Sequence, residues 1–306
     1  MICFMYAGQG SQRVGMGADF YADDAGVRRL YDAFPADRDR SFHGPQAALN
    51  ETAATQPAMG LFAAAVTDYL AARGVRPDLT MGLSLGEYSA LYAAGSFTAR
   101  QLMTLLSRRG QAMAEAARQN PGVMAAVLGA DRCQVEAICA AVRAETGELV
   151  ALANDNAPGQ QVIGGSEKAV ALAGERLQAA GLRRPVPLQV SGAFHTPLMQ
   201  PAAEALRSAL REIPPQPPQI PVLSNVYAAP VAFDALEETL LVQLTSPVRL
   251  VDSFRQAQEM GATVFIEIGP GKVLTGLLRK TLGRTARVYA VDGLEGCRAL
   301  VDELGG

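Results

Sequence analysis

The order of apolar and polar positions along the chain predicts strands that alternate with helices. Short apolar runs typical of buried strands occur at residues 2–7, 79–83, 220–223 and 264–268. Apolar residues at helical spacing, or runs of good helix formers, occur at residues 57–73, 87–94 and 197–213. Pro57 and Pro197 are expected at the first position of their helices. This alternation indicates a mainly parallel sheet.

The pattern changes in the middle of the chain. Strand-like runs at 122–130, 149–154, 160–164 and 184–190 enclose helical runs at 134–143 and 168–180. This β-α-β-β-α-β order is that of the ferredoxin-like split unit. We therefore expect an α/β protein with two parts. A ferredoxin-like small domain at 122–190 would be inserted in a large α/β-hydrolase-like domain built from 1–121 and 191–306.

Composition narrows the class of protein. A chain of 306 residues is long enough for a large core or two domains. With 49% hydrophobic and 19% charged residues, it lacks the signature of disorder. The net charge of -3 comes without a Lys/Arg tract, so nothing indicates a nucleic-acid partner. An anionic substrate could still be bound by one or two arginines.

The cysteines and the apolar runs point to a cytoplasmic protein. The four cysteines form neither a CxxC pair nor a Cys/His cluster, so no disulfide framework and no metal site are expected. The N-terminal MICFMYAGQG shows no secretory signal. The most apolar helical run, 59–72, is interrupted by Asp68 and falls short of a membrane span. We expect no membrane association.

Candidate chemistry begins at Gly82, Ser84 and Gly86. They form a GxSxG pattern, which in acyl-transfer enzymes holds a nucleophilic serine on a sharp turn between a strand and a helix. In a chain with 30 glycines, an ordinary Gly-rich loop is the alternative. The strand expected before Ser84 and the helix expected after it favour the nucleophile.

A serine nucleophile needs a base, and histidine is the usual one. The chain has only two histidines. His43 lies in a loop-like SFHGP segment, whereas His195 lies between a predicted strand and the helix opened by Pro197, so His195 is favoured. No acid between serine and histidine has motif support; a backbone carbonyl could instead accept from the Nδ1 atom of the histidine.

The chain resembles a known family over nearly its whole length. The motifs are AGQGSQRVGMG (7–17), GLSLGEYSAL (82–91), SRRG (107–110), NDNAPGQQVIGG (154–165), SGAFHTPLM (191–199), SNV (224–226), TSPVR (245–249) and EIGPGKVLTGL (267–277). Together they resemble the malonyl-CoA:acyl carrier protein transacylase family.

The resemblance implies a ping-pong reaction. A malonyl group would pass from malonyl-CoA, through an acyl-serine, to the phosphopantetheine thiol of an acyl carrier protein. Ser84 matches the nucleophile and His195 the base, with the main-chain carbonyl of Gln243 holding the histidine. Gln9 and the N–H of Leu85 match the oxyanion-binding pair. No cofactor is implied beyond the coenzyme A thioester, which is a substrate.

The resemblance also assigns the substrate contacts. Arg109 matches the residue that binds the malonyl carboxylate, a group that a guanidinium meets with two parallel hydrogen bonds. The residues alone leave Arg108 as an equal candidate.

Phe194 matches an aromatic position associated with malonyl over methylmalonyl, and Asn156 and Asn225 match positions near the substrate or the serine turn. Leu83 departs from the histidine that many relatives carry there, and altered packing with retained activity is expected.

The sequence leaves three other functions open. A free-standing, trans-acting acyltransferase of a polyketide synthase shares these motifs. A serine esterase or thioesterase would use the same Ser84 and His195, but it has no need for a cation such as Arg109. A non-catalytic subunit that docks the carrier protein is disfavoured by the intact Ser84, His195 and Gln9.

Overall fold

The computed structural model describes residues 1–305, which contain a parallel sheet of the order β2-β1-β8-β9. Its strands are β1 (Ile2–Tyr6), β2 (Leu79–Gly82), β8 (Val264–Ile268) and β9 (Arg287–Val291). Every neighbouring pair in this sheet is parallel, with Tyr6 aligned to Gly82 on one side and to Ile268 on the other. The carboxyl ends of the strands therefore meet at one edge, where the expected nucleophile follows β2.

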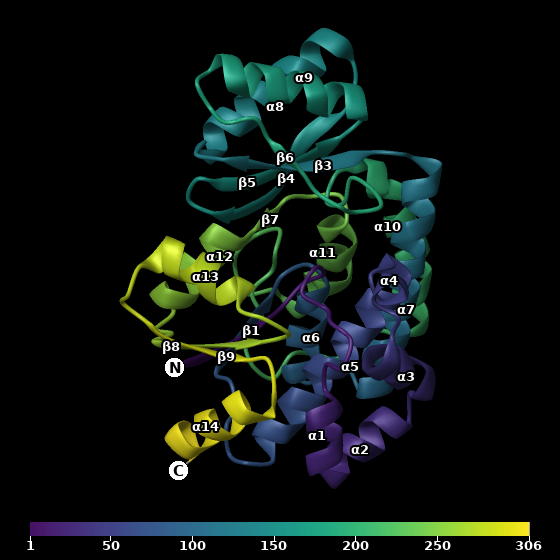
Figure 1. Ribbon diagram of the computed structural model, residues 1–306, viewed down its shortest axis with the longest axis vertical. Coiled ribbons are helices and arrows are strands. Elements are labelled where there is room, and N and C mark those ends of the chain that lie inside the picture. Colours follow the sequence, from purple (N-terminus) through teal and green to yellow (C-terminus); the bar gives the residue numbers. More distant parts are fainter. Residues whose placement is uncertain (306) are drawn as a thin grey trace.

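Both faces of this sheet are buried, which explains the continuous apolar runs of its strands. In β1, Phe4 and Tyr6 point to one side and join the larger core cluster with helices α5 (Thr52–Ala71), α6 (Leu85–Ala93) and α7 (Ala99–Gln119). Cys3 and Met5 point to the other side and join a cluster with α12 (Leu250–Glu259) and α13 (Val273–Leu282). Figure 1 shows these two helix groups on opposite sides of the sheet.

The helices around this sheet account for most of the remaining chain. They are α1 (Ala18–Asp23), α2 (Ala25–Asp32), α3 (Pro35–His43), α4 (Gln46–Leu49), α5 (Thr52–Ala71), α6 (Leu85–Ala93), α7 (Ala99–Gln119), α10 (Gln200–Glu212), α11 (Leu236–Gln243), α12 (Leu250–Glu259), α13 (Val273–Leu282) and α14 (Leu294–Leu304). Short 3₁₀ turns precede α10 and α11, at Pro197–Met199 and Phe233–Ala235. Within residues 1–305, no helix is both long and apolar enough to cross a membrane.

A second sheet lies beyond the first, at the top of Figure 1, with the order β6-β3-β5-β4-β7. Its strands are β3 (Val123–Leu128), β4 (Val150–Ala157), β5 (Gln160–Gly165), β6 (Val186–Pro187) and β7 (Val248–Arg249). The pairs among β3, β4, β5 and β6 are antiparallel, whereas β7 pairs with β4 in parallel. Helices α8 (Arg132–Thr146) and α9 (Glu167–Ala179) cover one face and share a core with it.

Strand β7 connects the second sheet to the part of the chain that follows α11. It comes from the chain segment after α11 and pairs Val248 with Asn154 and Arg249 with Asp155. The segment that precedes β7 contains Gln243. Strand β4 is thus paired with a strand that follows α11, the helix whose last residue is Gln243 of the expected catalytic centre.

Several predicted elements differ from the structure. Helix α5 begins at Thr52, so Pro57 lies inside it and not at its first position. The residues before Pro57 are almost all buried, and the Thr55 hydroxyl donates to the Leu49 carbonyl, so tertiary packing extends the helix past the expected boundary. Within 197–213, a 3₁₀ turn precedes α10, which ends at Glu212.

Two predicted strands that contain proline differ from the structure. In the predicted strand 184–190, only Val186–Pro187 pairs, as an edge strand, where prolines are tolerated. The predicted strand 220–223 is wrong. Only isolated bridges form there, between Thr80 and Val222 and between Leu223 and Pro230.

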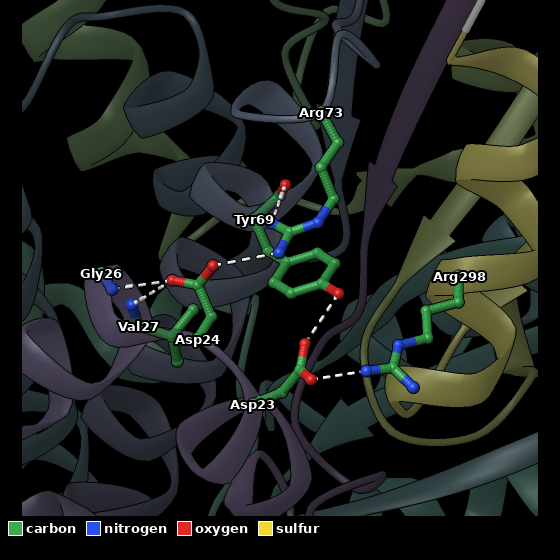
Figure 2. Close-up of polar contacts among 7 residues, drawn as sticks. All are labelled: Asp23, Asp24, Gly26, Val27, Tyr69, Arg73 and Arg298. Atoms are coloured by element: carbon green, nitrogen blue, oxygen red, sulfur yellow. Dashed lines mark hydrogen bonds and ion pairs between the residues drawn. The ribbon is translucent and has the colours of Figure 1, made fainter.

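Polar contacts fasten the C-terminal helix to the start of the chain, as Figure 2 shows. Arg298 of α14 pairs with Asp23, which also accepts a 3.0 Å hydrogen bond from the Tyr69 hydroxyl of α5. Arg73 stacks 3.3 Å from the centroid of the Tyr69 ring and donates to Asp24, which caps the first turn of α2. These contacts tie α14, α1 and α5 together at the end of the molecule away from the second sheet.

Gly86 offers a test of the packing between β1 and α6. A Cβ atom there would lie 2.3 Å from the Tyr6 carbonyl oxygen, and backbone cannot yield as a side chain can. We expect Gly86→Ala to lower the free energy of unfolding by about 2 kcal/mol. Urea denaturation followed by circular dichroism measures this change.

The control for Gly86→Ala is Gly276→Ala, in the exposed part of α13. A Cβ at Gly276 meets nothing within 4 Å, so the better helix propensity of alanine should raise the free energy of unfolding by up to about 1 kcal/mol. Equal effects of the two substitutions would contradict the close approach of β1 and α6.

Candidate active site

Ser84 lies on a sharp turn that two glycines make possible. It follows β2, precedes α6 and has a positive φ of 56°, which is rare for a residue other than glycine. A Cβ on Gly82 would lie 2.1 Å from the carbonyl carbon of Gly86, and one on Gly86 would meet the backbone of β1. The GxSxG spacing is therefore required by backbone packing, and the turn presents the Ser84 hydroxyl to a cleft.

His195 is in hydrogen-bond contact with Ser84. Its Nε2 atom lies 2.8 Å from Ser84 Oγ, and its Nδ1 atom lies 2.8 Å from the main-chain carbonyl oxygen of Gln243. Because a carbonyl only accepts, Nδ1 carries the proton and Nε2 accepts from the serine hydroxyl. The backbone of His195 also has a positive φ, of 59°. His43, the other histidine, is exposed at the end of α3.

The surroundings keep His195 neutral. Burial and, to a smaller extent, the positive charge of Arg109 lower its pKa to about 4, while the hydrogen bond to the Gln243 carbonyl acts in the opposite direction. The side chain is only 4% exposed. At neutral pH the imidazole is therefore in the form that can take a proton from Ser84.

The cleft in front of Ser84 has a volume of about 500 Å³ and lies where the two sheets face one another. The segment after β1 contributes Gln9 and Gln12, and the serine turn contributes Leu83 to Leu85. The second sheet contributes Asn154, Asn156 and Val162. Carboxyl-end loops of the parallel sheet thus form one wall, and strands of the second sheet form the other.

Gln9 and Leu85 lie at the cleft beside the nucleophile. The Gln9 amide donates a 3.2 Å hydrogen bond to the Thr52 hydroxyl and lines the cleft. Leu85 is the first residue of α6, so its N–H has no acceptor within the helix. Helix N-termini carry partial positive charge, which suits a developing negative charge near Ser84.

Arg109 is the cation of the cleft. It is 0% exposed as a residue, yet its guanidinium borders the cleft, with Nη2 donating to Ser84 Oγ at 3.1 Å. The same Nη2 donates to Gln243 Oε1 at 2.9 Å, and Nη1 donates to Gln56 Oε1 at 2.9 Å. Burial lowers the pKa of Arg109, while Tyr88 and Glu87 oppose that shift.

Arg108, which the residues alone could not separate from Arg109, lies elsewhere. Its guanidinium pairs with Glu212 of α10, and its side chain is 42% exposed. One position along a helix turns a side chain by about 100°. The structure therefore brings Arg109, and not Arg108, to Ser84.

The remaining sequence candidates divide into two groups. Phe194 and Asn156 line the cleft, and the Oδ1 atom of Asn156 is buried with no hydrogen-bond partner among residues 1–305. Asn225 does not line the cleft; it lies at the serine turn, the second of the two locations that the resemblance implied. Its Oδ1 atom accepts from Ser84 N at 2.7 Å, and its Nδ2 atom donates to Gly82 O at 2.6 Å. Asn225 supports the serine turn.

Sequence reasoning missed two side chains of this network. Gln56 is the acceptor for Arg109, and Glu87 accepts from Gln243 Nε2 at 2.6 Å and from Asn225 N at 3.1 Å. Both lie in helices that are buried almost all round. A polar residue inside such an apolar run is itself a signal that a buried partner exists.

The arrangement suits acyl transfer with an anionic acyl group. A hydroxyl contacts a neutral imidazole, N–H donors lie beside it, and an arginine lies within reach of the same oxygen. No group of three or more His, Cys, Asp or Glu side chains in residues 1–305 is arranged to hold a metal ion.

Comparisons with known proteins agree with this geometry. A family model described as an acyl transferase domain matches residues 3–296. A malonyl CoA-acyl carrier protein transacylase of Bacillus subtilis (strain 168) is 41% identical over 297 residues, which cover 95% of this chain and 93% of the relative.

Solved structures of such enzymes have the same fold. An MCAT from Streptococcus pneumoniae aligns with a TM-score of 0.94 at 37% identity and covers 99% of this chain and 100% of its own. A malonyl-transacylase solved in complex with its type II PKS acyl-carrier protein aligns with a TM-score of 0.92 at 35% identity, with 99% of each chain covered. The chain therefore belongs to the acyl transferase family, and its relatives within it are malonyl CoA-acyl carrier protein transacylases.

Proposed function

We propose that this protein transfers a malonyl group from malonyl-CoA to the phosphopantetheine thiol of an acyl carrier protein, through a malonyl ester on Ser84. The observation that carries this proposal is the buried guanidinium of Arg109, which lies 3.1 Å from the hydroxyl that His195 contacts from the other side. A cation at this place matches an acyl group that ends in a carboxylate.

In the first half-reaction, His195 Nε2 takes the proton of Ser84 as Oγ attacks the thioester carbonyl carbon. The Gln9 amide and the Leu85 N–H would donate to the resulting oxyanion, and such donors are worth about 3 kcal/mol each in barrier height. The C–S bond then breaks, and the imidazolium returns its proton to the coenzyme A sulfur. The Gln243 carbonyl holds the ring in the required tautomer throughout.

The second half-reaction reverses these steps with a different thiol. His195 takes the proton of the phosphopantetheine thiol, and the sulfur attacks the carbonyl carbon of malonyl-Ser84. The ester C–O bond breaks, and the proton returns to Ser84 Oγ. The products are the malonyl thioester of the carrier and the free enzyme.

Two cleft residues are proposed to act on the acyl group. Phe194 stands next to the base and lines the cleft, so its ring would occupy space that an α-methyl group needs. Excluding one methyl group is worth only about 1 to 3 kcal/mol, so selection against methylmalonyl is expected to be moderate. Asn156 lines the same cleft and would contribute a hydrogen bond to the donor; its Oδ1 atom is buried with no partner in residues 1–305.

A polyketide carrier is the second candidate partner. The solved malonyl-transacylase that aligns here was captured with a type II PKS acyl-carrier protein. Transfer assays with a fatty-acid carrier and a polyketide carrier at equal concentration separate the two readings. A hydrolase reading is disfavoured by Arg109, which a simple esterase does not need.

We also propose the division into domains that the sequence suggests. Residues 1–121 and 191–306 would form the α/β-hydrolase-like unit, with 122–190 as a ferredoxin-like insertion. The order β6-β3-β5-β4 and the helices on one face support this division. That the protein works in the cytoplasm and needs no cofactor besides its thioester substrate stays a prediction.

Ser84→Ala tests the nucleophile. We expect no covalent malonyl adduct after incubation with malonyl-CoA, because no other hydroxyl is in contact with His195 Nε2 in residues 1–305. Intact-protein mass spectrometry measures the adduct. Ser89→Ala, which removes another buried serine of α6, should still form it. An adduct that persists on Ser84→Ala refutes the assignment.

Arg109→Ala tests the recognition of the malonyl carboxylate. Loss of the charged hydrogen bonds should lower kcat/KM for malonyl-CoA by roughly a hundredfold, while transfer of an acetyl group survives or improves. The matched control is Arg108→Ala, which removes an exposed neighbouring side chain and should leave kcat/KM for both acyl donors unchanged. Equal losses for the two donors would count against the proposed role.

The depressed pKa of His195 predicts an unusual pH profile. The base is lost only when the imidazole is protonated, as the pH falls through its pKa of about 4. The first-turnover release of coenzyme A should therefore stay constant from about pH 8 down to about pH 5.5 and fall below that. Stopped-flow measurement, with circular dichroism to verify folding at each pH, tests this. An inflection near pH 6.5 would show an ordinary histidine.

A further inference from the structure

A buried carboxylate, Glu87, lies near the serine turn and outside the cleft. Glu87 is 0% exposed and does not line the cleft. Its Oε2 atom accepts hydrogen bonds from Gln243 Nε2 at 2.6 Å and from Asn225 N at 3.1 Å. Burial of an acid is costly, and the mechanism above makes no use of this one.

The contact with Gln243 settles which way that amide points. Gln243 Nε2 donates to Glu87 Oε2 and to the Ser84 carbonyl oxygen, at 2.6 and 3.1 Å. Because both partners only accept when Glu87 is ionised, the amide nitrogen must face them. The amide oxygen is then turned to Arg109, whose Nη2 donates to it at 2.9 Å. A flipped amide would present an N–H to the guanidinium.

We propose that Glu87 is a positioning residue for the reaction: it orients the Gln243 amide, and through that amide it holds the Arg109 guanidinium in line with Ser84. The inference rests on the proposed function, since it assigns Arg109 to the malonyl carboxylate. Glu87 would act on the acyl group that the enzyme prefers without touching it.

A second contact of Glu87 supports the same role. The backbone N–H that it holds belongs to Asn225, whose side chain bonds both Ser84 N and Gly82 O. The acid therefore bonds the Gln243 side chain and the Asn225 backbone, and the side chains of both residues brace the serine turn. Both come from chain positions more than 130 residues away, so one carboxylate aligns two distant segments on a single turn.

Glu87 can act as a hydrogen-bond acceptor whether or not its carboxyl group is ionised. Burial raises its pKa to about 7, against the hydrogen bonds from Gln243 and Asn225 and the positive charge of Arg109. Its neighbours with titratable groups are Arg109 of α7 and Tyr88 of its own helix. The Oε1 atom has no hydrogen-bond partner in residues 1–305, so a proton there leaves both bonds of Oε2 in place.

Two substitutions of opposite consequence test the proposal. Glu87→Gln keeps an acceptor oxygen at the Oε2 position. Glu87→Met keeps the approximate size of the side chain but removes that oxygen. The measurement is the ratio of kcat/KM for malonyl-CoA to that for acetyl-CoA. We expect Glu87→Met to lower this ratio at least tenfold, because a misaimed Arg109 harms only the anionic donor. Glu87→Gln should keep the ratio within threefold.

A matched control and a double variant exclude a merely structural effect. Glu267 is also a buried acid, and it accepts from the N–H groups of Leu274 and Thr275, outside the cleft. Glu267→Met should lower the melting temperature and leave the donor ratio unchanged. In a Gln243→Met background, Glu87→Met should change the ratio less than twofold, because its intermediary is already gone.

The outcomes separate this inference from the proposed function. The positioning role is overturned if Glu87→Met lowers kcat/KM for both donors by the same factor. It is also overturned if Glu87→Met keeps its full effect on the ratio in the Gln243→Met background. If Glu87→Met does not fold, Glu87→Gln still tests the positioning role, which is overturned if that variant lowers the malonyl-to-acetyl ratio of kcat/KM tenfold. If the native protein itself forms no malonyl-Ser84, the proposed function fails before the variants are compared.

Discussion

The close approach of backbone around Ser84 is the constraint on which the rest of the site depends. Helix α6 packs against the end of β1 so tightly that Gly86 has no room for a Cβ atom, and Gly82 has none against Gly86. Ser84, which joins β2 to α6, has a positive φ of 56°. That geometry lifts the Ser84 hydroxyl out of the turn and places the free N–H of Leu85 beside it. Nucleophile and expected oxyanion donor therefore come from one local structure.

The turn alone gives no reactivity, and distant segments supply what it lacks. His195, Asn225 and Gln243 all reach the turn from more than 100 residues away along the chain. Buried polar groups of this kind stabilise only when nearly every donor and acceptor is paired. Gln243 meets this condition most fully: its carbonyl holds His195, and its amide bonds Arg109, Ser84 and Glu87. Base, cation and nucleophile are thus aligned through a single side chain and its backbone.

The sequence predicted those parts of the molecule that local pattern determines. The apolar runs of β1 and β8 and the alternation of strands with helices indicated the parallel sheet, and strand, GxSxG and helix indicated Ser84. The start of α5 at Thr52 depended on burial by other helices, which a proline rule cannot include. Sequence spacing could not show that Arg109 faces the cleft or that Asn225 supports a turn. The role of Glu87 could not be assigned from its position in an apolar run, because its partner Gln243 lies 156 residues away.

The relative size of two interactions determines how the cleft should discriminate among acyl groups. Throughout residues 1–305, no carboxylate lies within 4.0 Å of the Arg109 guanidinium; its hydrogen bonds go to neutral oxygens of Gln56, Gln243 and Ser84. An incoming carboxylate would give this buried cation its first direct counter-charge, and hydrogen bonds between charged groups are worth about 1.5 to 3 kcal/mol each. The ring of Phe194 acts only by excluding a methyl group, worth about 1 to 3 kcal/mol. Two charged bonds outweigh one excluded methyl, so the acid end of the acyl group should govern selection, with its α-carbon substituent second.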